Sequence, residues 1–129
     1  MQAKARTLNF LSLMNADSNQ AIAVFMTASS REEAGQLADM LVSKRLAACV
    51  QIMREMESVY RWQGTIERQR EVLLIAKTVS SKFTELEREV VALHSYDTPE
   101  IVAFPLTAGS RPYLEWLSAN VSEEKQDDN

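Results

Sequence analysis

Residues 47–78 read AACVQIMREMESVYRWQGTIERQREVLLIAKT, and this stretch decides the fold. Its composition is typical of β-strands: Val, Ile, Tyr, Trp and Thr are frequent, no proline interrupts it, and its one glycine lies at the midpoint. Because a tight hairpin turn favours glycine, the sequence predicts two long strands joined at Gln63-Gly64. On the first arm the apolar side chains share one parity, the pattern of a half-buried strand: Ala48, Val50, Ile52, Met56, Tyr60 and Trp62.

The outer half of this hairpin is expected to project beyond its own domain. Each arm has about fifteen residues, which at ~3.3 Å per residue spans roughly 50 Å. A globule of about 100 residues has a radius of gyration of only ~13 Å. Residues 72–76 are apolar on both parities, as in a core strand, whereas residues 67–71 are polar on both. The sequence therefore predicts an inner half in the core and an outer half that overhangs.

The tip of the hairpin carries Tyr60, Trp62 and Ile66. A two-stranded ribbon is only marginally stable alone in water, so these side chains need cover, and we expect another copy of the chain to provide it. The alternative is a bulge or bend within residues 54–58 that folds the hairpin back onto its own domain.

The bulk composition indicates one soluble domain without a disulfide framework. The chain has 129 residues, 46% of them hydrophobic and 25% charged, with a net charge of −4. This charge argues against a nucleic-acid groove, and the apolar runs are too short to span a membrane. The one cysteine, Cys49, is expected to be a small buried hydrophobe. With three glycines and no phosphate loop or catalytic constellation, we expect no enzymatic activity.

The segment before the hairpin predicts a strand followed by a helix. Residues 21–27 form a continuous apolar run, as in a central strand buried on both faces. Ser30 and Glu33 form a capping box at the start of the helix. Lys44 and Arg45 lie in its last turn, where the helix dipole favours positive charge.

The segment after the hairpin predicts a helix, a strand and a short third helix. Ser80 or Ser81 is expected to cap the second helix. Residues 101–107 form a strand, and Pro105 places it at a sheet edge or near a strand end. The third helix begins near Pro112.

The predicted order is that of an α+β, ferredoxin-like β-α-β-β-α-β sandwich with a C-terminal helix. We expect this domain to occupy residues 21–121, between an N-terminal extension (1–20) and an acidic tail (122–129), both disordered. The extension is a poor secretory signal, so we expect a cytoplasmic location. The sheet's open face also needs cover, which is a second argument for self-association.

Several segments in this order resemble the CutA family of divalent-cation tolerance proteins: VFMTASS, KRLAACV, SVYRWQGTIE, EVLLIAKT, HSYDTPEIVAFPL and YLEWL. The resemblance implies a homotrimer whose long hairpins pair across subunits. It also implies binding of copper or other divalent ions and a role in metal tolerance, with no tightly bound cofactor expected. The alternative is a trimeric sensor or scaffold, similar to PII-type signalling proteins, that binds a small molecule or protein in clefts between subunits.

The resemblance also points to metal ligands. Family members that bind copper have a cysteine after the first strand and two histidines before a Tyr-x-Thr-Pro-Glu segment. Here Met26 stands at the cysteine position, Leu93 at the first histidine and His94 at the second. A thioether and an imidazole suit copper, so Met26 and His94 are the candidate ligands, with modest affinity or further ligands from other subunits. The alternative for His94 is a hydrogen bond to the turn or to Asp97.

The remaining candidates are residues of a cleft between subunits. Asp97 and Glu100 offer oxygen ligands from one loop, or form an Asx turn and a surface carboxylate. Lys77 ends a buried strand, so we expect it to pair with Glu100 or to face an anion. The candidate cleft residues are Tyr60, Trp62, Lys77, Tyr96, Asp97, Glu100 and Trp116.

Overall fold

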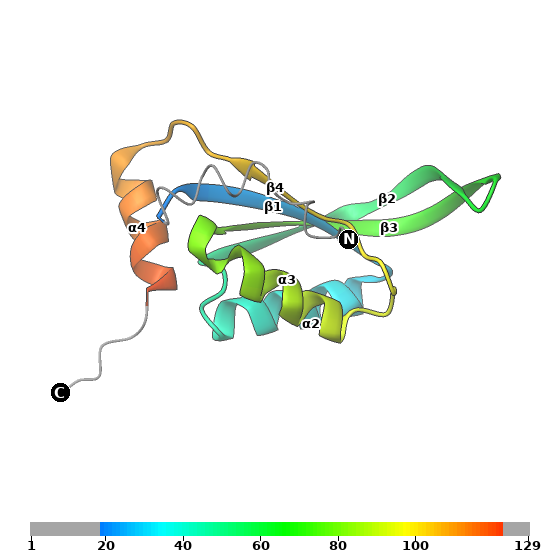
Figure 1. The fold of residues 1–129 in the computed structure, drawn as a ribbon, viewed down its shortest axis with the longest axis horizontal. Helices are drawn as coiled ribbons and strands as arrows, with labels where there is room; N and C mark the ends of the chain where they lie inside the picture. Colours follow the sequence, from blue (N-terminus) through cyan, green and yellow to red (C-terminus); the bar gives the residue numbers. More distant parts are fainter. Residues whose placement is uncertain (1–18, 123–129) are drawn as a thin grey trace, which may run out of the picture.

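The computed structural model describes residues 19–122, and its four strands form one antiparallel sheet in the order β2-β3-β1-β4 (Figure 1). The elements are β1 (Ala21–Ala28), α2 (Arg31–Ser43), β2 (Cys49–Trp62), β3 (Thr65–Val79), α3 (Phe83–Leu93), β4 (Ile101–Pro105) and α4 (Arg111–Val121). This confirms the ferredoxin-like order with its C-terminal helix. The predictions for residues 1–18 and 123–129 lie outside the described residues.

The hairpin turn has the predicted position. Trp62 pairs with Thr65, so the loop consists of Gln63 and Gly64 alone. Both have a positive φ, 50° and 87°, as the two central residues of a type I′ turn require. This turn twists in the same sense as the strands, which explains how a two-residue loop can join arms of this length.

A β-bulge divides the hairpin into an inner and an outer part. Ile52 pairs with Leu74 and Glu55 with Val72, so two residues of β2 face one residue of β3 between these pairs. The extra residue reverses the alternation of β2. The prediction that one parity stays on one face is therefore wrong: Val50 and Ile52 pack on the core, but Met56 and Tyr60 do not share their face.

The outer part, residues 55–71, is called the ribbon below, and it extends beyond the helices (Figure 1). Its tip exposes apolar side chains, with Trp62 54% and Ile66 60% exposed. The bulge lies close to the predicted bend, but it does not fold the hairpin back over the helices of its own domain. Within one subunit the tip is therefore left in water.

Helices α2 and α3 cover one face of the sheet (Figure 1). The core between them and the sheet consists of fully buried aliphatic side chains: Ile22, Val24, Met26, Leu37, Leu41, Val72, Leu74, Leu86 and Val90. α4 packs at the end of the sheet through Leu117 and Val121 against Val79. On the opposite face Phe25 and Phe104 pack with ring centroids 4.9 Å apart, and Phe104 remains 47% exposed.

The end of α2 differs from the prediction, because the helix stops at Ser43 and its last turn holds no basic residue. Arg45 has a φ of 59°. Its N–H donates to the carbonyl of Val42, and the N–H of Leu46 donates to that of Leu41, the pattern of a Schellman cap with arginine in the usual glycine position. The Arg45 guanidinium instead donates to the carbonyl of Asn120, near the end of α4.

Two further boundaries are corrected. Ser80 and Ser81 do not cap α3; they belong to a 3₁₀ turn, η2 (Ser80–Lys82), that leads into the helix, whose N-cap is Lys82. β4 ends at Pro105 rather than continuing to residue 107, although the N–H of Leu106 still donates to the carbonyl of Ala21 at 2.9 Å. β4 is an edge strand, as predicted. In the described range no helix is both long and apolar enough to cross a bilayer.

Candidate functional site

A cavity of about 620 Å³ lies between the ribbon and the loop that follows α3, and is called the ribbon cavity below. Its lining comes from β1, from both arms of the ribbon and from the loop: Thr27, Ser58, Val59, Tyr60, Trp62, Gln69, Glu71, Tyr96, Asp97, Thr98 and Glu100. The structure therefore brings together five of the predicted cleft residues: Tyr60, Trp62, Tyr96, Asp97 and Glu100.

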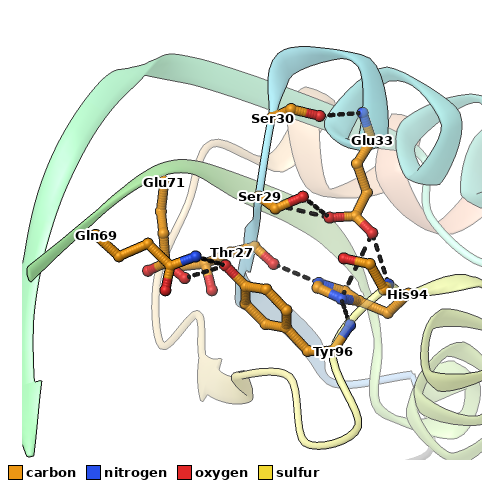
Figure 2. Close-up of polar contacts among 9 residues, drawn as sticks. Thr27, Ser29, Ser30, Glu33, Gln69, Glu71, His94 and Tyr96 are labelled. Atoms are coloured by element: carbon orange, nitrogen blue, oxygen red, sulfur yellow. Dashed lines mark hydrogen bonds and ion pairs between the residues drawn. The ribbon is translucent and has the colours of Figure 1, made fainter. Parts of the chain in front are cut away.

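Glu71 takes part in a network of polar contacts in this cavity, and Figure 2 shows the bond from Gln69 to Tyr96 and the bond from Tyr96 to Glu71. Glu71 is only 8% exposed. Its carboxylate accepts one hydrogen bond from the Ser58 hydroxyl at 2.7 Å and another from the Tyr96 hydroxyl at 2.8 Å. Gln69 donates to the Tyr96 hydroxyl at 2.9 Å and accepts from Tyr60 at 2.7 Å. The two arms of the ribbon and the loop are thus joined by one network.

Tyr96 keeps its proton over the whole physiological range. Burial raises the pKa of its phenol, and the hydrogen bond to Glu71 and the negative charge of that carboxylate raise it further. The phenol therefore acts as a neutral donor to Glu71 and does not add a charge to the cavity.

His94 is buried behind the cavity, and both of its ring nitrogens form hydrogen bonds (Figure 2). Nε2 lies 2.7 Å from the carbonyl of Thr27, and Nδ1 accepts from the N–H of Tyr96 at 3.0 Å. These partners define the neutral tautomer with the proton on Nε2. The alternative prediction for His94, a hydrogen bond to the turn or to Asp97, is confirmed for the turn, where the partner is the N–H of Tyr96.

Glu33 holds the loop from the side of α2. Its backbone N–H donates to the hydroxyl of Ser30, as in a capping box, but its carboxylate reaches past the capping residue and accepts from the N–H and hydroxyl of Ser29 and from the N–H of Ser95. The capping box is therefore only half formed. Burial alone would raise the pKa of Glu33, but these hydrogen bonds outweigh it and lower the pKa from 4.5 to about 2.

The predicted metal ligands are not arranged as a ready-made site. Met26 is fully buried in the core under the helices, and the nitrogen lone pair of His94 is already used by Tyr96. Among residues 19–122 no group of three or more His, Cys, Asp or Glu side chains is placed to hold a metal ion. Cys49 is half-buried at the start of β2, not deep in the core as predicted.

Lys77 and Trp116 lie away from the cavity. Lys77 is on the inner half of β3, where its ammonium stands 5.4 Å from the ring centroid of Tyr113, and Tyr113 in turn packs on Trp116 at 5.6 Å. The ammonium of Lys77 therefore stands near an aromatic ring of α4 and not beside Glu100. The alternative, that Lys77 faces an anion, stays a prediction.

Sequence reasoning missed Ser58, Gln69 and Glu71. Residues 67–71 are polar on both parities, a pattern that favours an overhanging outer half and does not single out a buried carboxylate. Glu71 could have been identified from its pairing register with β2, the strand that contains the bulge. Once the bulge shifts β2, Ser58 and Glu71 lie close enough to bond across the ribbon.

Comparison with known proteins places the chain in a family. Residues 22–120 match the family of the CutA1 divalent ion tolerance protein. The chain belongs to this CutA1 family. It is 47% identical over 97 residues to the divalent-cation tolerance protein CutA of Thermus thermophilus, and the match covers 75% of this chain and 94% of that protein. The resemblance seen in the sequence is thus confirmed.

Solved structures of the family agree with the fold. The Thermus thermophilus protein has a TM-score of 0.77 at 46% identity, and the match covers 78% of this chain and 97% of that one. The Archaeoglobus fulgidus CutA structure also has a TM-score of 0.77, at 42% identity, covering 79% and 99%. The CutA1 family is described by tolerance to divalent ions rather than by a reaction.

The predicted cytoplasmic location is wrong in the light of these relatives. The CutA protein of Arabidopsis thaliana, 47% identical over 96 residues, is named chloroplastic, and the match spans 74% of this chain but only 53% of that protein. The Archaeoglobus fulgidus protein is described as periplasmic. Family members therefore occupy other compartments, and the shared domain fold does not specify the cytoplasm.

Proposed function

We propose that this chain is a non-enzymatic homotrimer that binds divalent or copper ions and contributes to tolerance of such ions. The observation that carries the proposal is the CutA1 family match over residues 22–120, a range that includes the ribbon, the lining of the ribbon cavity and nearly all of α4. Ion tolerance is the property by which the matched family is described. The apolar surfaces that a single subunit leaves exposed support self-association, and the trimer is the assembly that the resemblance to the family implies.

Two separate surfaces support self-association. The ribbon tip exposes Trp62 and Ile66, and the face of the sheet opposite the helices exposes Val102 and Phe104, each by more than 40%. Large aromatic side chains of this kind are typical anchors of protein interfaces. Because the two surfaces belong to different parts of the subunit, one copy can present its ribbon while its open face receives a neighbour.

Ion binding is proposed as a property of the assembly rather than of one subunit. Asp97 and Glu100 are exposed carboxylates on one loop, and hard divalent cations prefer oxygen ligands. One subunit does not offer a cluster of three ligands within the described residues. His94 would have to give up its contact with Tyr96 before its lone pair could reach a metal, so a second copy is needed to complete a coordination shell.

The test is a titration of the full-length protein with copper and zinc salts, followed by calorimetry. The variants are Asp97→Asn with Glu100→Gln, and His94→Ala, each checked for folding by circular dichroism. Glu57→Gln, on an ion pair with Arg68 outside the cavity, is the matched control. Saturable binding that the loop variants abolish supports the proposal; no binding below high-micromolar concentrations contradicts ion binding by this chain.

The ribbon cavity favours a second candidate function, a trimeric sensor or scaffold that binds a small molecule. Its volume of about 620 Å³ lies in the range of small-molecule sites, and it combines aromatic side chains with a few fixed polar groups. A bare metal ion would fill only a small part of this space. Binding of an organic compound with no requirement for metal would favour this candidate.

A further inference from the structure

The charged side chains that line the ribbon cavity are all negative. Three carboxylates line it, those of Glu71, Asp97 and Glu100, and no Lys, Arg or His is among its lining residues in the described part of the chain. Asp97 and Glu100 are exposed on the loop, whereas Glu71 is nearly buried. A pocket of this charge repels phosphates and carboxylates and attracts cations, so nucleotides and organic acids do not fit it.

Glu71 carries a nearly buried charge whose bonded partners are hydroxyl groups. The donors are Ser58 and Tyr96, both neutral. The nearby arginines of β3 do not supply the missing positive charge, because Arg70 pairs with Glu55 at 2.9 Å and Arg68 with Glu57 at 3.5 Å, outside the cavity lining. Burying a carboxylate is costly unless a cation compensates it, so a cationic ligand would gain more here than in water.

The aromatic lining favours an organic cation over a metal ion. Tyr60, Trp62 and Tyr96 all line the cavity, and the negative faces of such rings attract ammonium groups. Gln69 bonds both tyrosine hydroxyls, which holds these two side chains in place without a ligand. A metal ion would need several converging ligand atoms at short distance, and the described residues hold no such cluster.

We propose that the ribbon cavity binds a small organic cation, an ammonium compound whose charge lies near Glu71 and whose body packs on Tyr60 and Tyr96. This inference rests on the second candidate function, that of a small-molecule sensor, and names its ligand class. Binding of an organic cation is independent of ion tolerance, because it does not require any residue of the cavity to coordinate a metal.

The test compares cations with neutral molecules of the same shape. Choline and 1,4-diaminobutane are titrated into the full-length protein in its solution assembly state, followed by calorimetry and by tryptophan fluorescence. Their controls are 3,3-dimethyl-1-butanol and 1,4-butanediol, in which uncharged groups replace the ammonium groups. We expect at least one cation to bind about tenfold or more tightly than its neutral counterpart, as a partly desolvated cation–aromatic and carboxylate contact requires.

Three variants locate the binding. Glu71→Gln keeps the shape of the side chain and removes its charge, and Glu100→Gln does the same at an exposed position where folding is not at risk. Both are expected to weaken cation binding, by about tenfold for Glu71→Gln, because the nearly buried charge interacts more strongly than the exposed one. Glu57→Gln removes the same charge from the ribbon outside the cavity and should leave binding unchanged.

The outcomes separate this inference from the function on which it rests. Equal binding of charged and neutral probes would overturn the cation class while retaining a small-molecule pocket. If neither cation binds below about 10 mM, a concentration far above the affinity of about 1 mM expected for a fragment of this size, the inference is overturned. Metal titration of the same samples tests ion binding separately, because choline does not coordinate metal strongly.

Discussion

The phenol of Tyr96 donates a hydrogen bond of 2.8 Å to the carboxylate of Glu71, 25 residues earlier in the chain. The two residues come from different parts of the fold: Tyr96 from the loop after α3 and Glu71 from the base of the ribbon. Both residues line the ribbon cavity, so their contact joins the ribbon to the loop there. It also ties down a loop that carries no regular secondary structure of its own.

Removing this phenol hydroxyl should destabilise the subunit. In Tyr96→Phe the nearly buried Glu71 loses a donor and Gln69 loses an acceptor, which should lower the free energy of unfolding by about 1–3 kcal/mol. Urea denaturation of the variant measures this loss. Tyr113→Phe, at a residue 37% exposed, is the control, and an equal effect of both substitutions would contradict a special role for the Tyr96 contact.

Stability should fall at acid pH through Glu33. The pKa of Glu33 is about 2 in the folded chain and 4.5 as the reference value. Because the folded value is the lower one, the contribution of Glu33 is fully present above pH 4.5 and is lost as the pH falls toward 2. Since solvent partly screens this carboxylate, we expect a total effect on the order of 1–2 kcal/mol.

The measurement is the midpoint of denaturant unfolding at a series of pH values that spans this window. Glu33→Gln should be less stable near neutral pH and should lose part of the pH dependence. Glu32→Gln, the neighbouring residue in the first turn of α2, is the control. A Glu33→Gln profile parallel to that of the unaltered protein would contradict the low pKa.

Two glycines in different backbone conformations provide a matched pair. Gly64→Ala should destabilise the hairpin by about 1 kcal/mol or more, because alanine is strained at a φ of 87° even though no atom lies within 4 Å of the new Cβ. Gly35→Ala, within α2 and equally free of close neighbours, should stabilise by about 0.5–1 kcal/mol. Thermal unfolding measures both changes, and shifts in the same direction would disprove the assignment of the turn.

The ribbon tip should matter for assembly more than for the subunit fold. Trp62→Ala removes a side chain that is 54% exposed in one subunit, so a solitary subunit would lose little. In an assembly it should cost about 2 kcal/mol or more per interface, as for other buried tryptophan anchors. Concentration-dependent thermal unfolding measures this, with Val91→Ala on α3, 43% exposed, as the control. No difference between the variants would rule out an interface at the tip.

The order of elements could be predicted from the sequence because each depends on local patterns. The glycine at position 64 and the apolar run of residues 72–76 were sufficient for the hairpin and for its buried half. The edge position of β4 followed from Pro105. These features depend on backbone conformation and on alternation, and neither requires knowledge of distant contacts.

The ribbon cavity could be predicted only in part, because its polar centre depends on register. A one-residue bulge between Ile52 and Glu55 decides which side chains of β2 face Glu71, and composition does not reveal it. The end of α2 and the start of α3 were misjudged for a similar reason. Arg45 adopts the left-handed conformation usual for glycine, and Ser80 begins a 3₁₀ turn instead of capping α3. Both conformations depend on contacts with residues that are distant in the sequence, and the local pattern does not reveal such contacts.

The central claim is that copies of this chain cover one another's ribbons and open faces. The solution mass of the purified full-length protein, measured by sedimentation equilibrium at micromolar concentration, tests it most directly. The proposed trimer has a mass of 43.8 kDa, three times the 14.6 kDa of one chain. A well-folded particle of 14.6 kDa would contradict the claim and leave the exposed tip of the ribbon unexplained.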